Sequence, residues 1–195
     1  MGRFLYSMNA SLDLRIEQVP GDDGAGEWLR VDEEFHRAAN DYARRVSAIV
    51  HGRRFFEAME EFRHRSAEDE TLPTYLREYA LIWAEKPKVL VSRTRTDPGD
   101  GTVLIDDDAM DRLAAYRAET DGRIAVGGAD LATQLLRAGL LDELLIWTHP
   151  SYLGFGRTLF DDYDRPLDLE LLDHATLTSG VTMRHYAIRR DEGVR

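Results

Sequence analysis

Three turns contain the residues of this sequence that are best suited to bind an anion. Gly52 precedes two arginines in "VHGRRFFEAM", Gly127 and Gly128 stand together in "RIAVGGADLATQLL", and Ser92–Arg95 follow an apolar run in "VLVSRTRTDPGDG". A glycine lets the backbone approach a phosphate closely, and the forked guanidinium group of arginine matches phosphate oxygens. The chemistry expected of these turns is the binding of a phosphorylated ligand.

The elements around the turns predict that they meet at one edge of a sheet. Each turn follows an apolar strand, and the glycine turns each lead into a helix. In an open α/β sheet, ligands bind outside the carboxyl ends of the strands, where helix N-termini present free N–H groups and a partial positive charge. We therefore expect a single anion site built from all three turns.

A simpler interpretation stands beside this one. Every strand-to-helix corner needs a turn residue, so a Gly-Gly pair is more often geometry than a ligand site, and exposed arginines are commonly only solvated. The stretch "VGGADLA" at 126–132 also lacks the G-x-G-x-x-G spacing that is typical of dinucleotide-binding turns. Three suitable turns at the same edge indicate a ligand site more strongly than any one turn alone.

Apolar periodicity and turn residues alternate along the whole chain. Strands are predicted at 3–13, 47–52, 88–92, 102–106, 123–126 and 142–150, and helices at 31–46, 53–65, 74–85, 107–120 and after Gly128. Loops are expected at 21–26 and 64–73, and aspartates are expected to cap the helix at 107–120. The tail, 166–190, alternates around a Ser-Gly turn, which is typical of antiparallel strands. A mixed sheet follows, parallel except near the C-terminus.

Composition excludes several classes of protein. The 195 residues are 43% hydrophobic and 31% charged, as expected for one globular domain over 1–195. The net charge of −11 argues against a nucleic-acid partner, and no apolar run is long enough to span a membrane. The N-terminus lacks a secretory signal, which favours the cytoplasm. With no cysteine and only scattered histidines, we expect no metal site.

The order of several motifs resembles the dihydrofolate reductase superfamily. These motifs are "SLD", Trp28, "GRRFFE", "KVLVSRT", "GGADLATQLLRAGLLDEL" and "HPSYLGFGRTLF". The chain is most similar to the bacterial branch that includes the reductase domain of riboflavin biosynthesis, from about Phe4 to Tyr186. The resemblance implies a three-layer α/β fold, with a mixed, mostly parallel central sheet, antiparallel C-terminal strands and helices on both faces.

The same resemblance implies that NADPH binds across the carboxyl edge of the sheet. The turn at Gly52 would contact the pyrophosphate. The turn at Ser92 would contact the 2′-phosphate, and the turn at Gly127 and Gly128 would contact the phosphates from the start of the other helix. The cofactor contacts implied in this way are Ala10, Ile16, Gly52, Arg53, Arg54, Ser92, Arg93, Thr94, Gly127, Gly128, Ala129, Asp130 and Leu131.

The substrate side is expected where the first strand ends and the first helix begins. The resemblance places Asn9, Asp13 and Trp28 against the substrate, and a carboxylate there could assist protonation. Asp32 is the first candidate for this catalytic role and Glu33 the second. Alternatively, acids in a first helical turn serve the helix dipole and solvent, and Asp13 orders its own loop.

Two departures from the usual pattern leave the function open. Relatives usually have glycine where this chain has Leu14 and threonine where it has Phe55. The leading hypothesis is an NADPH-dependent reductase of a small heterocycle, pterin-like or pyrimidine-like, or of a carbonyl compound. The alternative is a non-catalytic nucleotide-binding or sensor module on the same fold, and a flavin-binding reductase is the third hypothesis. A homodimer is expected, with the apolar C-terminal strands as its seam.

Overall fold

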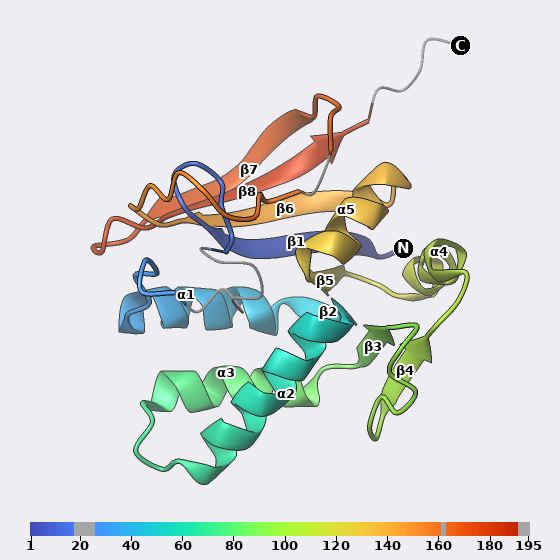
Figure 1. Ribbon diagram of the computed structural model, residues 1–195, viewed down its shortest axis with the longest axis horizontal. Helices are drawn as coiled ribbons and strands as arrows, with labels where there is room; N and C mark the ends of the chain where they lie inside the picture. The colour runs from blue at the N-terminus through green and yellow to red at the C-terminus, as the bar shows by residue number, and fades with distance from the viewer. Residues whose placement is uncertain (18–25, 161–162, 191–195) are drawn as a thin grey trace.

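An eight-stranded mixed sheet forms the centre of the protein (Figure 1). The computed structural model describes residues 1–17, 26–160 and 163–190. The strands are β1 (Arg3–Ala10), β2 (Val46–Gly52), β3 (Lys88–Val91), β4 (Thr102–Ile105), β5 (Arg123–Gly127), β6 (Leu141–Thr148), β7 (Asp168–Thr176) and β8 (Thr182–Arg189). Their order across the sheet is β4-β3-β2-β5-β1-β6-β8-β7.

The sheet is parallel from β4 to β6 and antiparallel from β6 through β8 to β7. The predicted mixed sheet is therefore confirmed, including the hairpin that turns at Gly180, whose φ of +84° suits glycine. The carboxyl ends of the six parallel strands lie at one edge, where the three turns were predicted to meet. Most of the loop expected at 21–26 lies outside the described residues.

Helices cover both faces and complete three layers. They are α1 (Glu33–Arg44), α2 (Arg53–Glu68), α3 (Thr74–Glu85), α4 (Ala109–Glu119) and α5 (Ala129–Arg137). Successive strand residues face opposite sides, so Leu5 of β1 packs with Phe35 of α1, whereas Phe4 and Tyr6 pack with α5. Helices α1, α2 and α3 pack against one another on the first face (Figure 1).

Two local predictions were wrong. Residues 64–68 were expected in a loop because they are polar, but α2 continues to Glu68, since helix-forming side chains there surround one buried residue, Ser66. The helix at 109–119 has no aspartate cap, because Asp108 adopts a left-handed backbone with φ 44° instead of the extended backbone of a capping residue. By contrast, α3 begins and ends where the apolar spacing predicted.

Candidate functional site

A cleft of about 1160 Å³ runs along the carboxyl ends of the parallel strands. All three predicted turns line it, together with residues of the loops that follow β1 and β6. The predicted cofactor residues that line the cleft are Gly52, Arg53, Arg54, Ser92, Arg93, Thr94, Gly128, Ala129, Asp130 and Leu131. The structure thus brings these residues into one site, while their contacts with a cofactor stay predictions.

Two helices start in the cleft without a side-chain cap. Gly52 precedes α2 and Gly128 precedes α5, and neither can supply a capping oxygen. The first N–H groups of a helix have no partner within the helix and point outward from its start. The two helix starts therefore present backbone donors and the positive end of two helix dipoles to the cleft, which suits an anion.

Arginines beside these helix starts add positive charge. Arg54 and Arg93 are exposed, and neither forms an ion pair within the part of the chain that the structure describes. Arg53 lies next to them and reaches Glu57, with 3.0 Å between Nη1 and Oε2. Because that pair is about 40% exposed, it leaves Arg53 able to exchange its partner for a ligand phosphate.

The Ser92 turn is held by its own hydrogen bonds. The Ser92 hydroxyl accepts from the backbone N–H groups of Thr94 at 3.2 Å and of Arg95 at 2.9 Å. Arg95 turns away from the rim and binds both carboxylate oxygens of Glu60, at 2.5 and 3.0 Å. Ser92 therefore shapes the turn, and Arg93 and Thr94 are the side chains that it presents to the cleft.

The Gly-Gly pair is required by geometry and also borders the cleft. A Cβ atom on Gly127 would lie 2.4 Å from Cδ2 of His51 and 2.5 Å from Cδ1 of Phe55. Gly128 has a φ of +101°, which side chains rarely adopt. The geometry thus matches the tight-corner interpretation for both residues, only Gly128 of the pair lines the cleft, and the phosphate contact stays a prediction.

Two of the predicted cofactor contacts, Ala10 and Ile16, are buried in the protein itself. Ala10 is 0% and Ile16 is 5% exposed, and both belong to the main hydrophobic core. Neither side chain lines the cleft, and the carbonyl of Ala10 accepts a hydrogen bond from the N–H of His149 at 2.8 Å. Any contact with a ligand would have to use their backbone atoms or follow a movement of the loop.

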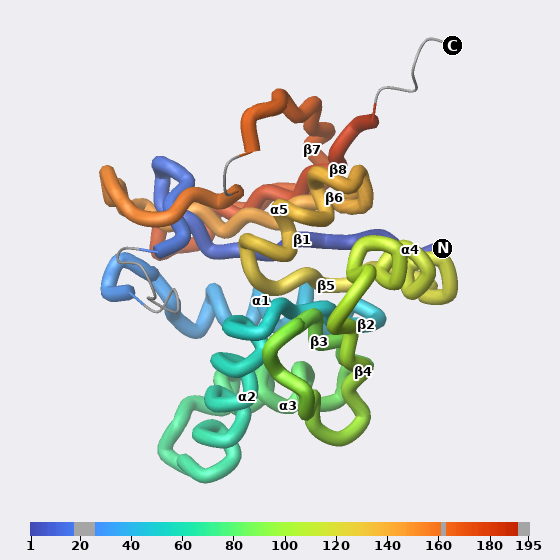
Figure 2. Tube along the Cα trace, turned by 45° about the vertical axis from the view of Figure 1, so that its right-hand side comes forward, coloured from blue at the N-terminus to red at the C-terminus, as the bar shows by residue number. Residues whose placement is uncertain are grey.

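The loops after β1 and β6 lie side by side, as Figure 2 shows, and Asp13 joins them. Its carboxylate accepts from the Ser11 hydroxyl at 2.7 Å and from the backbone N–H groups of Leu153 at 3.1 Å and Gly154 at 2.9 Å. The hydrogen bond from Ser11, with those from Leu153 and Gly154, lowers the pKa of Asp13 to about 2. This geometry matches the loop-ordering role that was the alternative for Asp13.

Leu14 has a backbone conformation that favours glycine. Its φ is 56°, in the left-handed region, and its carbonyl accepts a hydrogen bond from the N–H of Leu159 at 3.0 Å. A left-handed backbone costs a side-chain-bearing residue about 1 to 2 kcal/mol. The chain keeps the loop geometry that glycine would give and places a 48% exposed leucine there.

The acidic cluster at the start of α1 has partners other than a substrate. Asp32 is the N-cap and accepts from the backbone N–H three residues on at 2.8 Å. Glu33 binds Arg37 at 2.5 Å, and Glu34 accepts from the backbone N–H of Thr178 at 2.9 Å. None of the three lines the cleft. The geometry matches the helix-dipole alternative, and the catalytic roles of Asp32 and Glu33 stay predictions.

Sequence reasoning missed His149, which joins two of the predicted substrate residues. His149 follows β6, is 0% exposed, and its Nε2 lies 3.1 Å from Oδ1 of Asn9. Its Nδ1 accepts from the backbone N–H of Arg30 at 2.9 Å, and the ring of Trp28 packs edge-on at 5.5 Å. Burial, with the charge of Arg30, lowers the pKa of His149 to about 4. The signal available in the sequence was the "THP" directly after an apolar strand.

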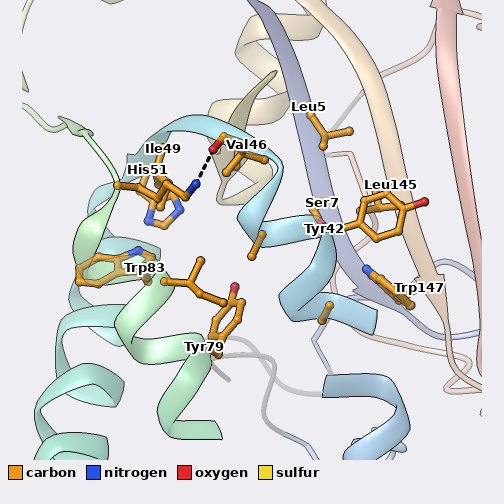
Figure 3. Close-up of a pocket in the computed structure, with 15 residues that line it drawn as sticks. Leu5, Ser7, Tyr42, Val46, Ile49, His51, Tyr79, Trp83, Leu145 and Trp147 are labelled. Carbon is orange, nitrogen blue, oxygen red and sulfur yellow. Dashed lines mark hydrogen bonds between the residues drawn. The ribbon is translucent and has the colours of Figure 1, made fainter. Parts of the chain in front are cut away.

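A second, smaller cavity lies between the sheet and the helices α1 and α3. It measures about 100 Å³, and Figure 3 shows aromatic side chains around it, among them Tyr42, Trp83 and Trp147. Nδ1 of His51 and Nε1 of Trp83 are buried there without a hydrogen-bond partner. Burial, with the nearby charge of Lys88, lowers the pKa of His51 to about 3. Sequence reasoning did not anticipate this cavity.

The sheet order, the flanking helices and the edge cleft define a dihydrofolate reductase-like α/β protein. Solved structures share the fold. A putative riboflavin biosynthesis protein from Shewanella sp. PV-4 is 23% identical, with a TM-score of 0.70 and coverage of 96% of this chain and 99% of the other. A pyrimidine reductase-like protein from Corynebacterium diphtheriae is 14% identical, with a TM-score of 0.62 and coverage of 97% and 92%.

The sequence itself identifies the family. The profile of the RibD C-terminal domain matches residues 5–183, so the chain belongs to the RibD C-terminal domain family. It is 25% identical to the uncharacterized protein YyaP of Bacillus subtilis over 185 residues, and this alignment covers 94% of each chain. RibD of Acinetobacter baumannii is 16% identical, with a TM-score of 0.61, and the match covers 97% of this chain and 58% of that one.

Proposed function

We propose that this protein is an NADPH-dependent reductase that transfers a hydride to a small heterocyclic or carbonyl substrate. The observation that carries this proposal is the single cleft that joins the three anion-suited turns. Membership of a family of reductase domains supports it. The cleft is slightly larger than the ~300–1,000 Å³ of typical small-molecule sites, which leaves room for a dinucleotide and a substrate together.

The helix starts and the arginines of the cleft suit the charged parts of the cofactor, and Asp106, Asp107 and Asp108 line the cleft beside them. The open start of α2, with Arg53 and Arg54, suits the pyrophosphate, and the start of α5 faces it from Gly128 to Leu131. Arg93 and Thr94 suit a 2′-phosphate, which distinguishes NADPH from NADH. When bound, the nicotinamide supplies the hydride. The protein then orients the two reactants and excludes water, and most of the rate enhancement comes from that positioning.

Titration calorimetry with NADPH tests the proposal. Arg93→Ala and Arg54→Ala should each weaken NADPH binding about tenfold, and Arg93→Ala should also remove the preference over NADH. Arg37→Ala, which changes the same charge far from the cleft, is the matched control. Absence of binding at millimolar NADPH would overturn the proposal. Gly128 is a poor probe because any side chain there strains the backbone.

The alternative, a non-catalytic nucleotide-binding or sensor module, rests on Leu14 and Phe55. Phe55 lines the cleft where relatives usually have a hydroxyl. Stopped-flow oxidation of bound NADPH by pterins, pyrimidines and quinones separates the two functions, because the module would bind NADPH without oxidising it. A yellow purified protein would instead favour a flavin-binding reductase.

We propose further that residues 1–195 act as one domain, in the cytoplasm and as a homodimer. The sheet takes strands from both ends of the described chain, which supports one domain. Strand β7 is an edge strand, and its Leu169, Leu171 and Leu172 are exposed, which supports a seam between copies. None of the helices described here is long and apolar enough to cross a membrane. Light scattering of the wild type and of Leu171→Glu tests the dimer.

A further inference from the structure

The side chain of Asn9 stands where the substrate is expected, at the carboxyl end of β1 in the middle of the sheet edge. It is partly exposed, pairs with Trp147 of β6 and lies beyond Tyr6, the last residue of β1 that pairs with β5, outside the residues that line the cleft. An amide side chain carries an acceptor, Oδ1, and a donor, Nδ2, so its orientation decides what it can recognise. Its surroundings therefore determine whether Asn9 offers a ligand a donor or an acceptor.

The hydrogen bonds of His149 fix that orientation. Nδ1 of His149 accepts from the backbone N–H of Arg30, so Nδ1 carries no proton. In a neutral imidazole the proton must then be on Nε2. Nε2 therefore donates a hydrogen bond to the side-chain atom of Asn9 that lies 3.1 Å away. That atom has to be the acceptor Oδ1. A flipped amide would place two donors against each other.

The packing around His149 keeps this arrangement in place. The ring is fully buried, and the rings of Trp28 and Phe35 lie 5.5 and 5.6 Å from it. Burial disfavours the protonated ring, which would lose the hydrogen bond from Arg30. Because Oδ1 of Asn9 is directed at His149, the amide presents Nδ2 to a ligand, and no described residue binds Nδ2.

Three of the described carboxylates expected on the substrate side already have partners. Asp32 caps α1, Glu33 is paired with Arg37, and Asp13 accepts from the loop after β6. An amino or amidine edge needs an acceptor in the site, whereas a carbonyl oxygen needs a donor. Nδ2 of Asn9 is such a donor, so it matches a carbonyl oxygen and does not match an amino group.

We propose that Asn9 is a specificity residue that recognises a carbonyl oxygen on the substrate and discriminates against an amino group in that position, and that His149 is its positioning residue. This inference rests on the proposed reductase function, and it narrows the substrate class to ring or open-chain compounds with an oxo group facing β1. A site built to donate a hydrogen bond discriminates strongly against a ligand that presents a second donor.

Two ring compounds of the same shape test the proposal: 2,4-dioxopteridine and 2,4-diaminopteridine. Their dissociation constants are measured by calorimetry on the full chain, with and without saturating NADP⁺. The wild type should bind the dioxo compound at least about tenfold more tightly. Asn9→Asp keeps an acceptor for Nε2 of His149 and replaces the donor by a second acceptor, so the preference should reverse.

Two variants of His149 test its positioning role. His149→Phe releases the amide, and the preference for the dioxo compound should fall to about twofold or less. His149→Gln can both donate to Asn9 and accept from Arg30, so it should restore the preference. Circular dichroism melts check that each variant is folded. The affinity for NADPH should be unchanged in Asn9→Asp, His149→Phe and His149→Gln, because these residues lie outside the phosphate-binding turns.

The outcomes separate this inference from the reductase proposal. An unchanged ratio in Asn9→Asp, a wild type that prefers the diamino compound, or binding of neither compound would overturn the inference even where NADPH binds. Absence of NADPH binding with the ratio reversed as expected would overturn the reductase and leave Asn9 as a specificity residue for another ligand.

Discussion

The starts of two helices in the cleft differ from the start of α1 in what their polar groups bind. Helices α2 and α5 begin at glycines, so their first N–H groups have no side-chain cap, whereas Asp32 caps α1. The acids that follow Asp32 also have partners, while Arg54 and Arg93 at the cleft pair with no described residue. Donors without partners are therefore the stronger basis for proposing a binding site than a conspicuous run of charges.

The two regions also differ in how they respond to pH. Arginines and backbone N–H groups keep their character across the whole range in which the protein is folded, so the cleft should bind phosphate at low pH as well. The region near α1 depends on a neutral His149. Acid should therefore disturb the region near α1 before it disturbs the cleft.

The largest expected effect is on stability as the pH falls. The pKa of His149 is about 4 in the folded protein and about 6.5 in the unfolded chain, so the unfolded state takes up the proton first. Stability from this group is present above pH ~6.5 and is lost as the pH falls toward ~4, by up to about 3 kcal/mol. Urea denaturation between these pH values measures it. His149→Gln should show a smaller slope, and an equal slope would contradict the assignment.

Gly127, compared with Gly52, gives the next largest effect. Gly127→Ala should lower the free energy of unfolding by about 2 kcal/mol, because the new methyl group would overlap His51 and Phe55. Gly52→Ala is the matched control: its Cβ would have no neighbour closer than 3.8 Å, and its φ is −70°. Equal losses in urea titrations of the two variants would show that the overlap is relieved by movement.

Salt dependence tests the open helix starts. NADPH binding should weaken with added salt, and the slope of log Kd against log salt should be smaller in Arg54→Ala and in Arg93→Ala than in the wild type. The expected loss in each variant at low salt is about tenfold, near 1.4 kcal/mol. Calorimetry at several salt concentrations measures it. A slope equal to that of Arg37→Ala would remove these arginines from the site.

The smallest effect decides the role of Asp32. Asp32→Ala should lower the free energy of unfolding by about 1 kcal/mol through loss of the cap, and Asp32→Asn should restore it because asparagine caps equally well. If Asp32 only caps the helix, Asp32→Asn keeps the rate of NADPH oxidation with any substrate found. A rate loss of about a hundredfold in Asp32→Asn would instead establish Asp32 as an acid catalyst.

Local patterns predicted most strands and helices and the mixed sheet, because each of these elements has its own periodicity, and the family resemblance implied the three layers. They also predicted which turns share the cleft, since the ends of parallel strands must meet at one edge. They did not predict the contact of Asn9 with His149, which are far apart in sequence and meet only because β1 and β6 are neighbours. They could not tell whether the Asp32 carboxylate would face the helix or a ligand, because that depends on side-chain geometry.

The position of β1 has a consequence for how the chain folds. It precedes the other seven strands described here, yet both of its neighbours, β5 and β6, come from the second half of the sequence. Pairings so distant in sequence close slowly and leave an apolar strand without partners until most of the chain has left the ribosome. The loops after β1 and β6 can join only after that step, so we expect the substrate end of the site to be among the last parts to form.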